Sequence, residues 1–150
     1  MRKGQTALEY LMTYGWAILI VIIVVAALYA LGLTKPCRWV GTQVREFPDF
    51  RVRDPKFDSN GQLTFYLERL KPEQVNITKV IYNGTGYTGA NTTLQLPLAS
   101  GESKLIIVPK ETGTAPNPGD CYSVDVKIEY TVIDTGAALT TYGKISGVVA

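Results

Sequence analysis

The chain has no histidine among its 150 residues. Histidine is the commonest general acid or base and a frequent metal ligand, so its absence removes the usual parts of hydrolytic and zinc-dependent sites. The sequence also lacks a phosphate-binding glycine loop, a nucleophile elbow and a dinucleotide-binding fingerprint. The sequence therefore predicts that the protein is not an enzyme and uses no metal or cofactor.

Charge is sparse and nearly balanced, with 15 Lys and Arg against 13 Asp and Glu and no dense basic cluster. A nucleic-acid interface needs concentrated basic charge, so we predict that the protein does not bind nucleic acid. One acidic segment, Asp58-Ser59-Asn60-Gly61, matches only the beginning of a calcium-binding loop. We interpret this segment as a turn.

Only two cysteines are present, Cys37 and Cys121, and neither belongs to a C-x-x-C motif. Zinc sites and thioredoxin-like motifs need closely spaced cysteines, so both are disfavoured. We predict a disulfide between Cys37 and Cys121, as suits an exported protein, with two buried free thiols as the alternative.

What the sequence has in abundance is one long apolar run near its N-terminus. From Gln5 to Thr34 the only charged side chain is Glu9. A helix over residues 5–33 is about 43 Å long, enough to cross a hydrocarbon layer of about 30 Å. Gly32 and Lys35-Pro36 mark its end, because glycine often follows the last turn of a helix and the residue before a proline is disfavoured in a helix. We therefore divide the chain into a leader 1–4, an apolar helix 5–34 and a separate domain 35–150.

The opening MRKGQTALEYLMTYGWAIL combines several features in a fixed order. Arg2 and Lys3 form a short basic leader that ends in Gly4. Gln5 follows, and Glu9 stands fifth in the chain that begins there. This arrangement resembles the class III signal peptide of archaeal type IV pilins, which are filament subunits. Archaeal flagellins share the leader, but their helices usually begin with a glycine-rich segment where this chain has TALEYLMTYGW, which favours a pilin.

The resemblance implies that a prepilin peptidase cleaves between Gly4 and Gln5 and leaves the helix on the protein. It also implies that Glu9 pairs with the new N-terminal amine of Gln5 in a neighbouring subunit. The precursor would lie in the cytoplasmic membrane. An assembly ATPase and a membrane platform protein would then build an extracellular helical homopolymer that serves in adhesion. Simple solvation at the headgroup boundary is the alternative role for Glu9.

Two other interpretations of the apolar segment stay open. As a permanent span, it would make the chain a single-span membrane-anchored surface binding protein. As a cleaved secretory signal, it would release a secreted hydrolase beginning near residue 31, but the apolar run is too long and Glu9 is misplaced for such a signal. Gly15, inside the helix, either permits close packing against a neighbour or is a tolerated small residue.

Beyond Pro36 the apolar period changes to two. Apolar and polar residues alternate strictly from Tyr122 to Val132, which is typical of a strand with one buried face. Asn60-Gly61, Asn83-Gly84 and the segment 116–119 provide turn signals. The prediction is an α+β protein in which an immunoglobulin-like antiparallel β-sandwich head domain follows the long N-terminal hydrophobic helix. With residues 122–132, the predicted strands are 38–44, 63–67, 77–82, 93–96, 105–108 and 139–148.

Three N-x-Thr sequons lie close together, with acceptors at Asn76, Asn83 and Asn91. Such motifs mark candidate N-glycosylation sites on the surface of exported proteins. Asn76 directly precedes the predicted strand 77–82, so an unmodified side chain in an extended strand is an alternative there. The cluster agrees with an extracellular location for the domain after Pro36.

Overall fold

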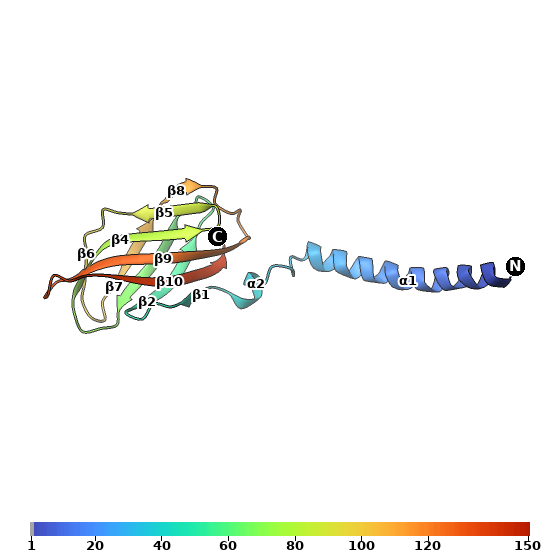
Figure 1. Cartoon of the computed structure of the whole chain (residues 1–150), viewed down its shortest axis with the longest axis horizontal. Helices are drawn as coiled ribbons and strands as arrows, with labels where there is room; N and C mark the ends of the chain where they lie inside the picture. Colours follow the sequence, from blue (N-terminus) through green and yellow to red (C-terminus); the bar gives the residue numbers. More distant parts are fainter. Residues whose placement is uncertain (1) are drawn as a thin grey trace. The chain divides into compact units, whose positions relative to one another are not determined.

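The computed structural model describes residues 2–150, except for the side chains of Arg2, Lys3 and Gln5. The chain forms two units, of which the first ends at Pro36 and the second runs from Cys37 to Ala150. The first unit contains one long helix and the second contains every strand (Figure 1). We call the second unit the β domain. Its start lies two residues beyond the predicted boundary at residue 35.

Helix α1 spans Arg2–Ala30, so it begins three residues before the predicted start at residue 5 and ends three to four residues before the predicted end at residues 33–34. Its C-terminus is closed by Gly32, which has a positive φ of 67°. The amide of Gly32 donates to the Tyr29 carbonyl, and the amide of Leu33 donates to the Leu28 carbonyl. These two bonds form a Schellman motif, in which glycine adopts the left-handed conformation at the helix end.

The predicted strand over residues 38–44 is wrong in its first half. Residues Cys37–Val40 form the short helix α2, and strand β1 spans only Gln43–Arg45. The Gly41 amide donates to the Cys37 carbonyl at 3.0 Å, and Gly41 has a φ of 71°. The ring of Pro36 restricts its φ to a value suited to the start of a helix, and Pro36 directly precedes α2. This local restriction outweighs the strand propensity of Trp39 and Val40.

One sheet of the β domain has seven strands, all paired antiparallel, in the order β1-β10-β9-β4-β5-β8, with β6 also paired to β4. The longest pairing joins β9 to β10, and β4 lies on the other side of β9 (Figure 1). Besides β1, its strands are β4 (Val75–Gly84), β5 (Tyr87–Asn91), β6 (Leu96–Leu98), β8 (Lys110–Gly113), β9 (Cys121–Val132) and β10 (Ala138–Val148).

The second sheet has three antiparallel strands in the order β2-β3-β7. They are β2 (Phe50–Phe57), β3 (Leu63–Arg69) and β7 (Ser103–Val108). Inner residues of both sheets belong to one hydrophobic cluster. The Phe57 ring of β2, for example, lies 4.9 Å from the Tyr122 ring of β9. Along β9 the even-numbered residues are buried, as the alternation predicted. The coarse prediction of a long apolar helix followed by antiparallel sheets is therefore confirmed.

Three strands were not predicted. β2 carries alternating arginines and Pro55, and its pairing with β3 is interrupted between Arg53 and Lys56. β5 contains few apolar residues, and all four residues of β8 are exposed. The strand predicted at 93–96 lies instead at Leu96–Leu98.

Two predicted turns have different outcomes. Asn60-Gly61 lies in a turn, where the Asp58 carboxylate accepts hydrogen bonds from the amides of Asn60 and Gln62. This turn is the interpretation that the sequence favoured over a calcium loop. Asn83-Gly84, by contrast, still pairs with β5, and the chain reverses at the next two residues, where Gly86 has a φ of 81°. Tyr87 pairs with Gly84, and its ring fills the space beside the glycine, which favours the later turn.

Candidate functional site

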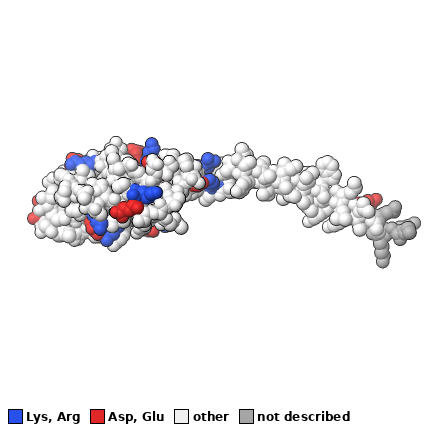
Figure 2. Space-filling model, turned by 90° about the horizontal axis from the view of Figure 1, so that it is seen from above, with Lys and Arg blue, Asp and Glu red and all other residues white. Residues whose placement is uncertain are grey.

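The surface of α1 is the largest apolar feature of the chain. Residues Thr6–Ala30 form a helix long and apolar enough to cross a membrane, and none of the residues in its most apolar stretch is buried. Figure 2 shows charged side chains of both signs on the visible face of the β domain and few on the helix. A helix that is apolar on all sides needs lipid or other helices around it.

Glu9 is the only charged residue of α1 beyond its first turn. It lies on the exposed helix surface, and its backbone carbonyl accepts a 2.9 Å hydrogen bond from the Thr13 hydroxyl. Within the described part of the chain, no residue forms a hydrogen bond or ion pair with its carboxylate. The side chains of Arg2, Lys3 and Gln5 lie outside the described residues, as does Met1. The predicted pairing of Glu9 with a neighbouring subunit is an intermolecular contact and stays a prediction.

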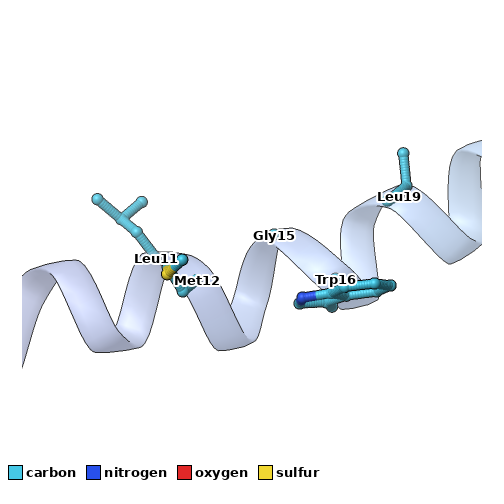
Figure 3. Close-up of a pocket in the computed structure, with 5 residues that line it drawn as sticks. All are labelled: Leu11, Met12, Gly15, Trp16 and Leu19. Carbon is cyan, nitrogen blue, oxygen red and sulfur yellow. The ribbon is translucent and has the colours of Figure 1, made fainter.

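A notch centred on Gly15 interrupts the helix surface close to Glu9. Leu11, Gly15 and Leu19 follow one another at four-residue spacing, with Met12 and Trp16 beside them (Figure 3). The notch has a volume of about 210 Å³. A Cβ atom added to Gly15 would meet no other atom within 4 Å. An apolar notch at a glycine accepts a side chain or the backbone of an adjacent helix, as is common where membrane helices pack.

The notch residues other than Gly15 were not identified from the sequence. The available signal was the four-residue spacing of two leucines around one glycine, which places all three on one helix face. In a helix that is apolar all round, this spacing does not stand out from neighbouring faces. The structure distinguishes the face around Gly15 from its neighbours, because the larger side chains there surround a notch at the glycine.

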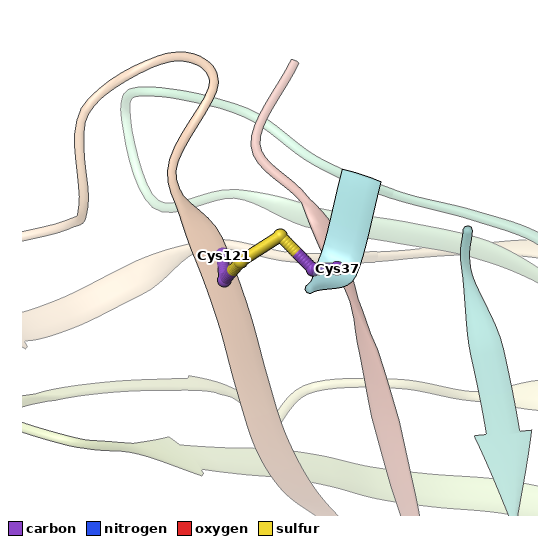
Figure 4. The surroundings of a disulfide bond; sticks show 2 residues. All are labelled: Cys37 and Cys121. Atoms are coloured by element: carbon purple, nitrogen blue, oxygen red, sulfur yellow. A yellow bond between two sulfur atoms is a disulfide. The ribbon is translucent and has the colours of Figure 1, made fainter. Parts of the chain in front are cut away.

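Cys37 and Cys121 form a disulfide, which confirms the predicted pairing and excludes two free thiols. The bridge joins α2 to the first residue of β9, with Cα atoms 5.7 Å apart (Figure 4). The sequence separation is 84 residues. Closing so long a loop in the unfolded chain corresponds to about 4 to 5 kcal/mol in the entropic description of disulfides. The bridge therefore fixes the start of the β domain, directly after the helical unit in sequence.

The three sequon asparagines have different environments. Asn76 donates its side-chain amide to Gln95 at 2.9 Å, and Asn91 donates to the Ile107 carbonyl at 2.9 Å. Asn83 is exposed at the end of β4, and no hydrogen bond involves its side chain within residues 2–150. The sequence identified all three acceptors and set Asn76 apart by its place beside a strand, but it could not distinguish Asn83 from Asn91.

A buried charged group that the sequence did not predict lies at one end of the β domain. Arg69 is only 1% exposed, and its guanidinium lies 5.0 Å from the Phe50 ring and 5.5 Å from the Tyr130 ring. Close by, Asp49 accepts a hydrogen bond from the Tyr130 hydroxyl at 2.9 Å and pairs with Lys71 at 2.5 Å. Burial acts to raise the pKa of Asp49, but these two hydrogen bonds and the charge of Lys71 hold it below its ordinary value. These contacts join β2, β3 and β9, so we interpret the group as structural.

Within residues 2–150, no three His, Cys, Asp or Glu side chains lie together in a group able to hold a metal ion. No family model matches the sequence, and a search of curated proteins found no significant match. The assignment of function therefore rests on the residues and their geometry.

Proposed function

We propose that the chain is the precursor of an archaeal type IV pilin that polymerises through its N-terminal helix into an extracellular filament. The observation that carries this proposal is an apolar helix with no buried residue in its most apolar stretch, and with one carboxylate five positions after Gly4. A prepilin peptidase would remove residues 1–4, and α1 would first lie in the cytoplasmic membrane. In the filament, the helices of many copies would surround one another and the β domains would face the solvent.

Transfer from lipid to filament needs an explanation, because lipid tails are as apolar as leucine. Helix association in such surroundings depends on close packing and on polar contacts between helices. The Gly15 notch provides a site for close packing with a second copy of the chain. Work supplied by an assembly ATPase and a platform protein would complete the transfer, as the resemblance to pilins implies.

Glu9 gives the packing its register in this proposal. A carboxylate surrounded by apolar groups is costly unless it is paired. Its partner would be the Gln5 amine that cleavage creates in a neighbouring subunit. Uncleaved chains have no amine at Gln5, so cleavage would also control which chains can assemble.

We further infer that the β domain is an immunoglobulin-like sandwich. The order β2-β3-β7 corresponds to strands A-B-E of such domains, and β10-β9-β4-β5 corresponds to G-F-C-C′. Two features depart from antibody domains. The disulfide joins α2 to the start of β9 instead of linking the B and F strands, and β6 pairs with β4 instead of forming a D strand beside E. Such domains commonly present their loops for recognition, which agrees with an adhesive filament.

Mass spectrometry of the N-terminal peptide, from protein sheared off the cell surface, tests the proposal. We expect the chain to begin at Gln5. An intact Met1 in a fraction released only by detergent would instead identify the single-span membrane-anchored surface binding protein, an alternative that the length of α1 also allows. A start near residue 31 would identify a secreted protein.

A further inference from the structure

The outer face of the seven-stranded sheet contains a groove, which we call the Tyr142 groove, with a volume of about 450 Å³. The strand register places Ile81, Lys127 and Tyr142 in one row across β4, β9 and β10. Asn83 and Asp125 belong to the next row. The groove is lined by these five residues and by Glu46, among others.

The side chains of the Tyr142 groove combine an apolar surface with a charged rim. Tyr142 is 63% exposed although it stands in the middle of a long strand, and Ile81 lies in the neighbouring position across β9. Asp125, whose side chain is 75% exposed, provides carboxylate oxygens, and Lys127 provides an ammonium group. A sugar ring has the matching surfaces, because its C–H face packs on an aromatic ring and its hydroxyls bond to carboxylates and ammonium groups. The groove therefore suits a saccharide.

The source of that saccharide is indicated by Asn83, which is both a wall of the groove and the acceptor of a sequon. Thr85 of the same sequon lies in the exposed hairpin turn between β4 and β5. The side-chain amides of Asn76 and Asn91 are engaged in hydrogen bonds, whereas no such bond occupies that of Asn83 in the part of the chain that the structure describes.

We propose that Asn83 is the principal N-glycosylation site and that the first sugars of its glycan lie in the Tyr142 groove. The donor would be a saccharide linked to a lipid phosphate or diphosphate. Transfer forms a bond between Asn83 Nδ2 and the anomeric carbon, and the carbon–oxygen bond to the phosphate breaks. The lipid phosphate leaves with the bonding electrons, and the amide loses one proton to solvent. The proposal requires export of the β domain but does not depend on filament assembly.

Two strand spacings of about 4.8 Å separate β4 from β10, so the glycan must extend from Asn83 across β9 to reach Tyr142. Asp125 lies between them, beside Asn83 in the register, and is placed to accept hydrogen bonds from the sugar hydroxyls. Covalent attachment keeps the local sugar concentration high, so each contact can be weak and the groove still be occupied.

Site occupancy is the first test, made on the full chain isolated from the cells that produce it. Chymotrypsin cleaves after Tyr82 and Tyr87 and so places the three sequons in separate peptides. We expect glycan mass mainly on the peptide of residues 83–87, and its loss in both Asn83→Gln and Thr85→Ala. Thr85→Ala is the matched control, because it removes the sequon and keeps the asparagine. A bare Asn83 would overturn the proposal, whether or not Asn76 or Asn91 is modified.

Chemical protection of Tyr142 tests whether the glycan lies in the groove. We expect nitration of Tyr142 by tetranitromethane to be several-fold slower in the glycosylated chain than in Asn83→Gln. Tyr66, which is 44% exposed on β3 in the other sheet, should react equally in both proteins. Equal nitration of Tyr142 with and without the glycan would overturn the seating in the groove.

A third arm distinguishes an attached glycan from a free one. Oligosaccharide released chemically from the glycoproteins of the same cells is added to the Asn83→Gln protein before nitration. We expect no protection of Tyr142, because the tether is missing. Protection by the free oligosaccharide, together with an unmodified Asn83 in the native chain, would show that the groove binds saccharides of other molecules and would overturn the proposal. The start at Gln5 is measured independently, so the two proposals can fail separately.

Discussion

At the scale of single residues, the buried tyrosines of the β domain differ in hydrogen bonding although all line one core. Burial raises the pKa of both Tyr82 and Tyr122 to about 12. The Tyr82 hydroxyl donates to the Gly61 carbonyl. The Tyr122 hydroxyl is buried and finds no hydrogen-bond partner within residues 2–150. A buried polar group without a partner costs free energy that its removal recovers.

Replacement of each tyrosine by phenylalanine tests this difference. We expect Tyr82→Phe to lower the free energy of unfolding by about 1 to 2 kcal/mol, because a buried hydrogen bond is lost. Tyr122→Phe should leave it unchanged or raise it. The measurement is urea unfolding of the full chain in detergent, followed by near-ultraviolet circular dichroism. Equal destabilisation by both changes would contradict the assignment.

The Asp49 group makes the stability of the β domain depend on pH. The pKa of Asp49 in the folded chain lies below its ordinary value of 3.8, so its contribution is fully present above pH 3.8 and is lost as the pH falls through the folded-state pKa. We expect Asp49→Asn to cost about 1 kcal/mol at neutral pH, because the charge interaction with Lys71 is lost and the Tyr130 hydrogen bond can remain.

The penalty of Asp49→Asn should shrink as the pH falls below 3.8 and through the folded-state pKa, because Asp49 then becomes protonated in the folded chain as well as in the unfolded chain. Urea unfolding of the original and altered chains at several pH values measures it. Lys144, which is paired with Asp125 at 3.9 Å on the exposed surface, provides the control. Lys144→Gln should change stability little at any pH. A penalty for Asp49→Asn that is constant with pH would contradict the assignment.

Glu9 acts in assembly under the proposed function, and its carboxylate has no hydrogen-bond or ion-pair partner among the described residues. We expect Glu9→Ala to be cleaved and to reach the membrane, while filament yield falls roughly tenfold or more, as the loss of a charge-assisted contact of about 1.5 to 3 kcal/mol implies. Quantification of sheared filaments measures the effect. Thr13→Ala, one turn along, should retain normal yield. A full yield from Glu9→Ala would contradict the register role.

At the scale of secondary-structure elements, α1 presents an apolar surface, and no residue in its most apolar stretch is buried. The notch at Gly15 is a recess in this surface and is lined by Leu11, Trp16 and Leu19, among others. We expect Gly15→Leu to fill the notch and reduce filament yield several-fold without affecting cleavage, because neighbouring helices could no longer approach closely.

Two controls separate the notch from general effects of size. Gly15→Ala adds one carbon atom that meets nothing within 4 Å in the chain itself and fills little of the notch, so filament yield should fall less than with Gly15→Leu. Ala17→Leu makes a comparable increase in volume on another face of the helix. Filament counts by electron microscopy, beside the amount of processed chain in the membrane, provide the measurement. A loss of filaments with Ala17→Leu equal to that with Gly15→Leu would show that the notch is not specific.

At the scale of the whole molecule, the helix and the β domain are separate compact units, and the disulfide belongs to the second. We expect reduction of the Cys37–Cys121 bridge to destabilise the β domain by up to about 4 to 5 kcal/mol. Helix α1 should keep its circular dichroism, because the bridge does not involve it. Urea unfolding with and without reductant measures the change. Unaltered stability after complete reduction would contradict this role.

The amino-acid sequence by itself determined the features that depend on local periodicity. The apolar run of α1, its end near Gly32 and the buried alternation of β9 follow from backbone geometry repeated along a continuous segment. The sequence, which contains two cysteines, also predicted their pairing in a disulfide. The resemblance at Gly4, Gln5 and Glu9 supplied the functional hypothesis.

Only the tertiary structure decided the features that depend on distant residues. β5 and β8 form where neighbouring strands offer pairing, although their own composition is weak. Arg69 is buried because Phe50 and Tyr130, remote in sequence, enclose it. Asn83 differs from Asn76 and Asn91 through the contacts that each makes after folding. The physical reason is that hydrogen-bond pairing and burial are settled between segments brought together by the fold, and no local period encodes them.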